Sequence, residues 1–235
     1  MIFENFDRKI YNDVFDFSTT YTLYKLENSG YIDRIKSVIS SGKEANVFLG
    51  YNFQKEPIAI KIYRIETSNF NNMYQYIAGD HRFEYVKLKK RDIVFAWAKK
   101  EFKNLEIAYN LNLSVPRPII WRKNVLLMDF IGNDEMPAPR AKDAPPKDPS
   151  AWFEKIMNFV EKLYKKGKLV HGDISEYNIL NFNEEPVIID MGQGVPSDHP
   201  LAYELLKRDL ENINRWFKKF GIKFDVNQKF KELVS

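Results

Sequence analysis

One segment of the sequence combines residue types that could transfer a phosphoryl group: His171-Gly172-Asp173-Ile174-Ser175-Glu176-Tyr177-Asn178. Asp173 is the candidate catalytic base. Asn178 follows five residues later and offers an amide oxygen, a neutral ligand suited to Mg²⁺ or Mn²⁺. Asp190 adds a carboxylate oxygen. A base beside such a metal is what ATP-dependent phosphoryl transfer requires, because the protein mainly positions the reactants and neutralises charge.

The chain after this segment should bring Asn178 and Asp190 together. Two short apolar runs, residues 179–182 and 187–190, flank the polar residues 183–186 in the pattern of a β-hairpin. In an antiparallel pair, the residue before the first strand lies beside the residue that ends the second, which predicts a shared metal site. Gly, Asp and Asn are also ordinary turn residues, so a simple surface turn is the competing interpretation of the segment alone.

Two charged residues stand where apolar side chains are expected. Lys61 lies within the apolar run Ile58-Ala59-Ile60-Lys61-Ile62, and Glu101 falls on the apolar stripe of a predicted helix. Because burying either charge alone is costly, we expect the two to pair, with the lysine also reaching phosphate oxygens of ATP. Two alternatives remain open: Lys61 faces solvent from a two-faced sheet, or Glu106 replaces Glu101.

A polar turn in the first quarter of the chain is the candidate phosphate-binding loop, with backbone N–H groups and hydroxyls as donors. Its residues are Ser41, Gly42, Lys43, Glu44, Ala45, Asn46 and Val47. The turn is not a Walker A loop, because Ser37 stands where that motif needs its first glycine and Glu44 where it needs Ser or Thr. A plain hairpin turn is the competing interpretation.

The elements that must position these residues begin with a short helix over residues 18–29, with Ser18 as N-cap and Gly30 just past its end. An antiparallel meander is predicted from strands over residues 32–40, 45–51 and 57–63. Residues 66–92 are polar and show no sustained period, so we expect a long, partly mobile insertion there.

A helix is predicted over residues 93–111, and two further strands over residues 119–121 and 125–130. The apolar stripe of this helix contains Val94, Ala98, Leu105 and Ala108. Residues 132–149 form a connector rich in proline and charge, which we take as the boundary between a domain half 1–131 and a half 132–235.

Two helices are predicted in the second half. The first opens with Asp148-Pro149, an N-cap followed by proline at the first helical position, and ends at about residue 166 before Gly167. The second spans residues 201–220 and is capped by Gly221.

The composition fits a folded protein and excludes several site chemistries. The chain has 235 residues, 44% hydrophobic and 29% charged, with a formal charge of +4. It contains no cysteine, which excludes disulfides and thiolate chemistry. No apolar run approaches the ~20 residues of a membrane span, and residues 1–7 do not resemble a secretory signal, so we expect a cytoplasmic protein.

Taken in order, these segments resemble the RIO family of atypical serine/threonine protein kinases, specifically the Rio-one type in a compact, archaeal-like form. The resemblance covers about residues 32–212. Its motifs are the turn 41–47, Ile60-Lys61, Lys100-Glu101-Phe102-Lys103-Asn104-Leu105, Val115-Pro116-Arg117-Pro118, Leu127-Met128-Asp129-Phe130-Ile131-Gly132, residues 171–180, Ile189-Asp190-Met191-Gly192-Gln193, His199-Pro200 and Arg208-Asp209.

The resemblance implies an α+β, bilobal protein-kinase-like fold, with an antiparallel N-terminal sheet and a mainly helical C-terminal lobe. It implies ATP with Mg²⁺ or Mn²⁺, Asp173 as the catalytic aspartate, and Asn178 and Asp190 as metal ligands. Met128, Asp129 and Ile131 would form the hinge, with backbone groups of the last two meeting adenine. Asp190 would also accept the phosphate transiently.

The sequence departs from ordinary protein kinases. Met191-Gly192 replaces the usual Phe-Gly, Gly172 replaces an arginine, and neither an activation segment nor an Ala-Pro-Glu motif follows Asp190. Regulation by a phosphorylated activation loop is therefore not expected.

The acceptor and the partners are less defined. The resemblance implies autophosphorylation or ATP hydrolysis in small ribosomal subunit maturation, with a pre-small-subunit particle as partner and no sequence-specific DNA. Thr67 and Ser68 are candidate phosphate acceptors, and the oligomeric state stays open. Two alternatives are a small-molecule kinase of the aminoglycoside or choline type, and a non-catalytic ribosome assembly factor that uses nucleotide as a switch.

Overall fold

The computed structural model describes residues 15–66, 70–86 and 89–235. The described residues divide into two compact units. Unit 1 comprises the described parts of Met1–Ile77, Tyr85–Phe102 and Arg117–Pro137. Unit 2 comprises Ala78–Glu84, Lys103–Pro116 and Ala138–Ser235. The predicted boundary after residue 131 stays a prediction.

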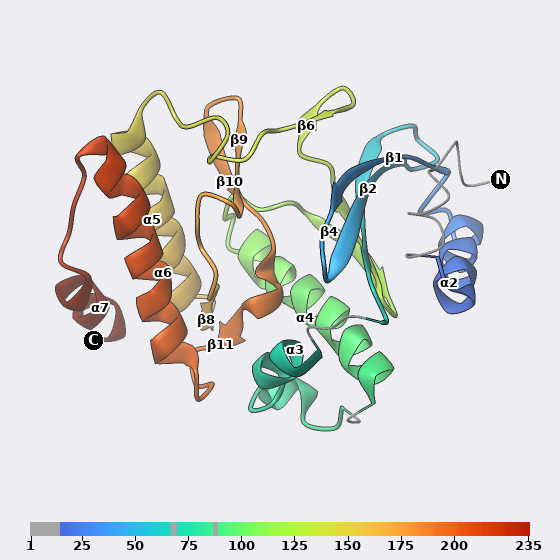
Figure 1. Cartoon of the computed structure of the whole chain (residues 1–235), viewed down its shortest axis with the longest axis horizontal. Coiled ribbons are helices and arrows are strands. Elements are labelled where there is room, and N and C mark those ends of the chain that lie inside the picture. The colour runs from blue at the N-terminus through green and yellow to red at the C-terminus, as the bar shows by residue number, and fades with distance from the viewer. Residues whose placement is uncertain (1–14, 67–69, 87–88) are drawn as a thin grey trace. The chain divides into compact units, whose positions relative to one another are not determined.

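Unit 1 is built on a five-stranded antiparallel sheet with the strand order β1-β2-β3-β5-β4 (Figure 1). Its strands are β1 (Arg34–Ser41), β2 (Ala45–Tyr51), β3 (Pro57–Tyr63), β4 (Pro118–Arg122) and β5 (Val125–Asp129). The predicted meander is confirmed, and strand boundaries differ by one or two residues. A small hairpin of β6 (Gly132–Asn133) and β7 (Met136–Pro137) lies within the segment predicted as a connector.

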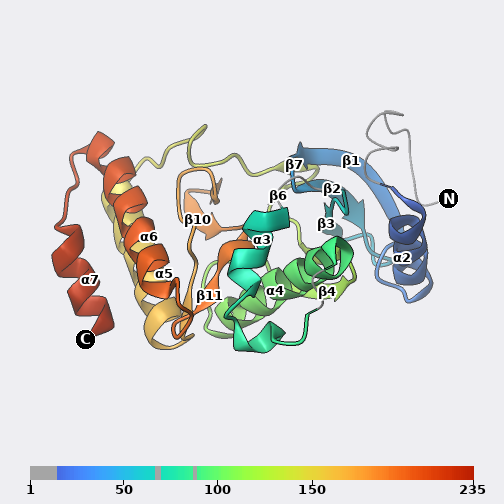
Figure 2. The same ribbon diagram turned by 60° about the horizontal axis from the view of Figure 1, so that its bottom comes forward.

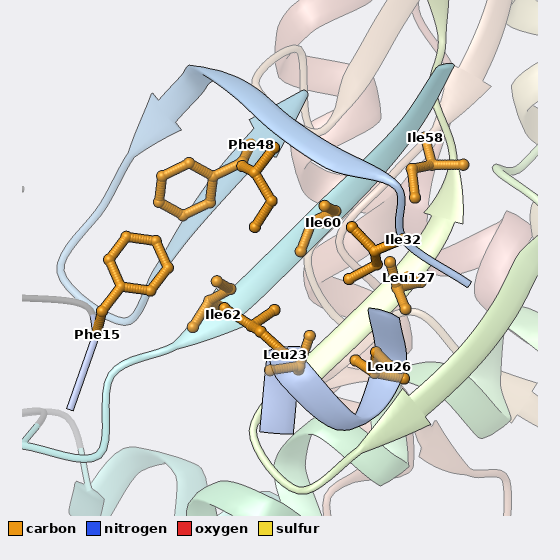
Figure 3. Packing of buried hydrophobic residues seen from close by; sticks show 11 residues of the cluster. Phe15, Leu23, Leu26, Ile32, Phe48, Ile58, Ile60, Ile62 and Leu127 are labelled. Carbon is orange, nitrogen blue, oxygen red and sulfur yellow. The ribbon is translucent and has the colours of Figure 1, made fainter. Parts of the chain in front are cut away.

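Helix α2 (Phe17–Asn28) covers one face of this sheet. Leu23 and Leu26 are fully buried, and they belong to one apolar cluster with the isoleucines of β3 and Leu127 of β5 (Figure 3). The N-cap is Asp16, whose Oδ1 accepts from the Thr19 N–H at 2.6 Å, so the prediction of Ser18 as N-cap was wrong. Aspartate caps well because its short carboxylate accepts from backbone N–H groups in the first turn.

The prediction of a long insertion over residues 66–92 was wrong in part. Helix α3 (Phe70–Ile77) occupies its middle and buries Met73, Tyr76 and Ile77. These residues follow the helical spacing of three to four, a short signal that the many neighbouring polar residues obscured. The ring of Tyr76 meets Trp97 edge-on at a centroid distance of 5.8 Å, which ties α3 to the next helix.

Helix α4 (Lys90–Asn110) starts three residues earlier than predicted. The four stripe residues named above are buried, at 0% or 1% exposure, which confirms the stripe.

Unit 2 is mainly helical. Its helices are α5 (Pro149–Lys165), α6 (Ala202–Phe217) and α7 (Val226–Val234), and three single turns, η1 (His81–Phe83), η2 (Met191–Gln193) and η3 (Lys218–Phe220), accompany them. Helices α5 and α6 lie side by side in both ribbon views, and Trp152 meets Trp216 edge-on between them (Figure 2). The predicted cap of α5 is confirmed, since Asp148 Oδ1 accepts from the Ala151 N–H at 3.0 Å.

Two short strand pairs complete unit 2. One joins β8 (Leu169–Val170) to β11 (Val195–Pro196), and the other is the hairpin of β9 (Ile179–Phe182) and β10 (Glu185–Ile188). The hairpin is confirmed, but its turn has two residues rather than four. Asn183 and Glu184 both have positive φ, at 53° and 66°, as tight two-residue hairpin turns require. None of the described helices has the length and apolar composition needed to cross a bilayer.

Candidate active site

Lys61 and Glu101 form a buried ion pair in unit 1. Lys61 lies on β3, and its Nζ atom is 2.8 Å from each carboxylate oxygen of Glu101 on α4. The two side chains are 9% and 1% exposed. The pairing decides between the interpretations left open by the sequence, because Glu106 instead contacts Lys103 on the half-exposed side of the helix. A lysine held by both carboxylate oxygens is fixed in position, which suits a candidate phosphate ligand.

The candidate phosphate loop is the β1–β2 turn. Gly42 donates to the Ala45 carbonyl at 3.0 Å, and Lys43 projects into solvent at the tip. Asn46 is fully buried behind the turn, and within the described residues its Nδ2 atom is a buried donor with no hydrogen-bond partner. Since an unsatisfied buried donor is costly, this nitrogen is a group that a phosphate oxygen could satisfy.

The candidate hinge residues lie at the end of β5 and just beyond it. Met128 is buried and pairs with Ala59 across the sheet. The Asp129 N–H donates to the Arg117 carbonyl at 2.9 Å, and the Arg117 guanidinium contacts the Asp129 carboxylate at 3.0 Å. Ile131 lies just beyond the strand and is half-buried. The side chain of Asp129 is thus occupied within the protein, and any role toward adenine falls to its backbone.

The candidate catalytic segment, residues 171–178 of unit 2, is held by Asp209 of α6. Its Oδ2 accepts from the Gly172 N–H at 2.7 Å and its Oδ1 from the Ile174 N–H at 2.8 Å. Burial raises the pKa of Asp209 to about 7, and the two N–H groups oppose that rise. Gly172 has φ of 81°, a conformation that glycine adopts without strain. The two bonds fix the backbone on both sides of Asp173.

Asp173 and Asn178 contact each other directly. The Asn178 Nδ2 donates to the Asp173 carbonyl at 2.9 Å and to its Oδ2 at 2.8 Å. Because the nitrogen serves both bonds, the Asn178 Oδ1 is the atom that can act as a metal ligand.

The hairpin brings the chain back to Asn178 one residue before Asp190. The Ile189 N–H donates to the Asn178 carbonyl at 2.9 Å, one residue beyond the last strand pair. Asp190 itself leaves the strand in the left-handed conformation, with φ of 63° and ψ of 64°, which aspartate tolerates better than most residues. The register pairs Asn178 with Ile189 rather than with Asp190, because the hairpin turn has two residues instead of four, and the shared metal site stays a prediction.

His171 connects the same two segments. Its Nδ1 accepts from the Asp173 N–H at 3.2 Å, so its Nε2 carries the proton and donates to the Ile189 carbonyl at 3.3 Å. Burial lowers the pKa of His171 to about 4, so it is neutral at pH 7. His171 therefore aligns the loop with the chain that directly follows β10.

Gln193 and Arg208, for which the sequence suggested no individual role, support Asp173. The Gln193 Nε2 donates to the Asp173 Oδ2 at 3.3 Å, and the Gln193 Oε1 accepts from Arg208 Nη2 at 2.8 Å. Arg208 also donates to the Gly172 carbonyl. A signal for Asp209 was present, because a carboxylate on the apolar stripe of Leu206, Leu210 and Ile213 poses the same burial problem as Glu101.

The donor set suits a hard divalent cation. One amide oxygen and one carboxylate are ligand types that Mg²⁺ accepts, and Mg²⁺ usually completes its shell with phosphate oxygens and water. Within the described part of the chain, no group of three or more His, Asp and Glu side chains is placed to hold a metal by itself.

A lysine–glutamate pair joining strand β3 to helix α4, together with an Asp–Asn loop followed by a hairpin ending in aspartate, defines an enzyme of the protein-kinase-like class. The RIO domain family model matches residues 46–230. The RIO-type serine/threonine-protein kinase Rio1 of Methanocaldococcus jannaschii is 41% identical over 97% of this chain and 78% of its own length. The protein of the same name from Haloferax volcanii is 41% identical over 92% and 74%.

Among solved structures, the Rio2 kinase-ADP/Mg²⁺-phosphoaspartate complex from Chaetomium thermophilum has a TM-score of 0.67 and 21% identity. The match covers 89% of this chain and 64% of that chain, and it confirms the predicted kinase-like fold. With the family model and the two relatives, it leads to a plain conclusion. The chain belongs to the RIO family.

Proposed function

We propose that this protein is an ATP-dependent atypical serine/threonine kinase with ATPase activity. The observation that carries the proposal is the contact of Asp173 with Asn178, together with the hairpin register, which pairs Asn178 with Ile189, the residue directly before Asp190. The two Rio1 relatives named as serine/threonine kinases support it.

In this proposal unit 1 supplies the nucleotide contacts. Lys61 neutralises charge on the ATP phosphates, and Glu101 keeps it extended. The turn of residues 41–47 donates backbone N–H groups to phosphate. The carbonyl of Asp129 accepts from the adenine amino group and the N–H of Ile131 donates to the ring, which matches the donor and acceptor pattern of adenine.

Unit 2 supplies the chemistry. Asn178 and Asp190 hold the metal, which neutralises negative charge on the transferred phosphoryl group when bound. Asp173 accepts the proton of the attacking hydroxyl or water, and Gln193 and Asn178 orient its carboxylate for that transfer. The two N–H groups bound by Asp209 keep the base in place.

Asp190 is also proposed as a transient acceptor. One carboxylate oxygen forms a bond to the γ-phosphorus, the bond from that phosphorus to the bridging oxygen breaks, and ADP leaves with the electron pair. Water or a Ser/Thr hydroxyl then attacks the aspartyl phosphate and gives its proton to Asp173. The phosphoaspartate in the Rio2 kinase complex supports this assignment.

The biological setting proposed is maturation of the small ribosomal subunit, with a pre-small-subunit particle as partner. This part rests on the family resemblance. The candidate acceptors Thr67 and Ser68 lie outside the described residues.

The test is incubation with γ-labelled ATP and Mg²⁺ of wild type, Asp173→Ala and Asp190→Ala. Acid-stable label indicates hydroxyl phosphorylation, and hydroxylamine-labile label that is lost in Asp190→Ala indicates the acyl phosphate. Transfer to an added aminoglycoside or choline instead would favour a small-molecule kinase. If nucleotide binds but neither label nor hydrolysis appears, the enzymatic proposal fails and a nucleotide-switched assembly factor remains.

A further inference from the structure

A chain of hydrogen bonds in unit 2 links the segment Ala78–Glu84 to the backbone that follows Asp190. At the outer end of this chain, Arg82 donates two parallel hydrogen bonds to the carboxylate of Asp80: Nε donates to Oδ1 at 2.9 Å and Nη2 donates to Oδ2 at 2.7 Å. The side chain of Asp80 is fully buried and that of Arg82 is 20% exposed. Such a two-bonded guanidinium has one defined orientation.

The remaining arm of this guanidinium reaches α4. Arg82 Nη1 donates to Asn104 Oδ1 at 2.9 Å. Because that oxygen is held, the amide nitrogen faces the opposite way, where it donates to the carbonyls of Met191 at 2.7 Å and Gly194 at 2.8 Å. Asn104 is fully buried, and its amide thus uses three hydrogen bonds in one fixed orientation.

These two carbonyls bracket the single turn η2, which starts directly after Asp190. The approach is close: a Cβ atom on Gly194 would lie 2.9 Å from Asn104 Nδ2, which only glycine avoids at that position. Asp190 has a left-handed backbone conformation, so its side-chain direction depends on how the following turn is held. Asn104 holds that turn at both ends.

A second anchor fixes the segment that carries Arg82. His199 Nδ1 accepts from the Leu201 N–H at 3.1 Å, so its Nε2 bears the proton and donates to the Ala78 carbonyl at 2.9 Å. Gly79 between these contacts has φ of 89° and lies against Pro200. The segment Ala78–Glu84 is therefore docked on the chain downstream of Asp190 at two points.

We propose that Arg82 is a positioning residue for phosphoryl transfer: through Asn104 it sets the backbone turn that aims the Asp190 carboxylate at the metal and the γ-phosphate. The inference rests on the proposed function, because it assigns Arg82 to the same site. Replacing a residue that does not bind the metal but orients one of its ligands typically lowers metal affinity or activity by about 10- to 100-fold.

The test compares Arg82→Met and Arg82→Lys with wild type. Arg215→Met is the matched control, since Arg215 is an exposed arginine of unit 2 with a single 2.9 Å bond to Asn212. In Arg82→Met we expect kcat for phosphoryl transfer or hydrolysis to fall about 10-fold or more and the Mg²⁺ concentration for half-maximal rate to rise about 10-fold. The KM for ATP should change by less than about 3-fold, because the nucleotide contacts stay intact. Arg82→Lys should recover only part of the lost kcat, since one ammonium group cannot replace the hydrogen bonds that Arg82 donates through Nε, Nη1 and Nη2.

A second measurement does not depend on activity. Amide hydrogen exchange at residues 191–194 should accelerate about 10-fold in Arg82→Met and stay unchanged in Arg215→Met. If wild type shows no phosphoryl transfer or hydrolysis, the proposed function fails and the positioning role fails with it, while this exchange still reports whether Arg82 holds the turn. Unchanged exchange at residues 191–194 in Arg82→Met overturns the proposal. Faster exchange in this variant, together with a kcat and an Mg²⁺ requirement like those of wild type, also overturns it, because the contact would then be purely structural.

Discussion

Replacing Lys61 and Glu101 singly and together should reveal a strong coupling between them. The Lys61 Nζ lies 2.8 Å from both carboxylate oxygens, and the side chains are 9% and 1% exposed. At an effective dielectric constant of about 20, unit charges about 3 Å apart attract by about 5–6 kcal/mol, which offsets the cost of removing both charges from water. Removing one partner leaves the other charge buried.

Lys61→Met and Glu101→Met should therefore each lower the free energy of unfolding by about 3–5 kcal/mol. The double variant should regain most of this loss, because methionines of similar shape fill the site without charge. The coupling energy of the cycle should exceed about 3 kcal/mol. ATP binding should be weak in both proteins that carry Lys61→Met, including the stable double variant.

Urea unfolding of the four proteins measures the cycle, and nucleotide titration measures binding. The pair Lys103 and Glu106 provides the matched control on the same helix, because its charges are 2.6 Å apart but its side chains are 42% and 37% exposed. Its coupling should not exceed about 0.5 kcal/mol. A Lys61–Glu101 coupling energy as small as that of the control pair would refute the argument that burial strengthens the energetic coupling between the two charges.

Three further predictions concern the catalytic segment and the core. Asp173→Asn should lower phosphoryl transfer by about 10²- to 10⁴-fold with unchanged unfolding, measured by label transfer and circular dichroism; a loss below about 10-fold would contradict its role as base. Burial raises the pKa of Asp209 from 3.8 to about 7, so the folded state binds the proton of this carboxyl more tightly than the unfolded state does. The free energy of unfolding of wild type should therefore fall relative to that of Asp209→Asn as the pH rises from about 4 to 7. The expected slope is up to about 1.4 kcal/mol per pH unit. Parallel unfolding curves over that range would show that the carboxyl titrates normally. Leu26→Ala should lower the free energy of unfolding, measured with urea, by about 2–5 kcal/mol. At urea concentrations well below the unfolding midpoint, its kcat should stay near the wild-type value. A loss of kcat in the fully folded variant would contradict the assignment of Leu26 to the core alone.

Local patterns were enough to predict most of the elements. The N-cap of α5, the apolar run of β3 and the stripe of α4 are short-range features, and they matched the observed helices and strands within a few residues. The β9–β10 hairpin itself follows from the same local logic, but its two-residue turn sets a register that the sequence did not predict. Where local signals were short or ambiguous, prediction failed: α3 was missed, and Ser18 was taken for the cap instead of Asp16.

Sequence alone therefore determined which residue types stand at which spacing: a base, an amide and a carboxylate around one loop and hairpin, and two charges in apolar surroundings. Only the tertiary structure decided which partners satisfy those charges. It selected Glu101 over Glu106 for Lys61, brought Asp209 from a distant helix to the backbone of the catalytic segment, and joined Arg82 to the turn after Asp190. The physical reason is that a buried polar group must find a partner, but the partner is set by packing between segments far apart in the chain, which no local pattern encodes.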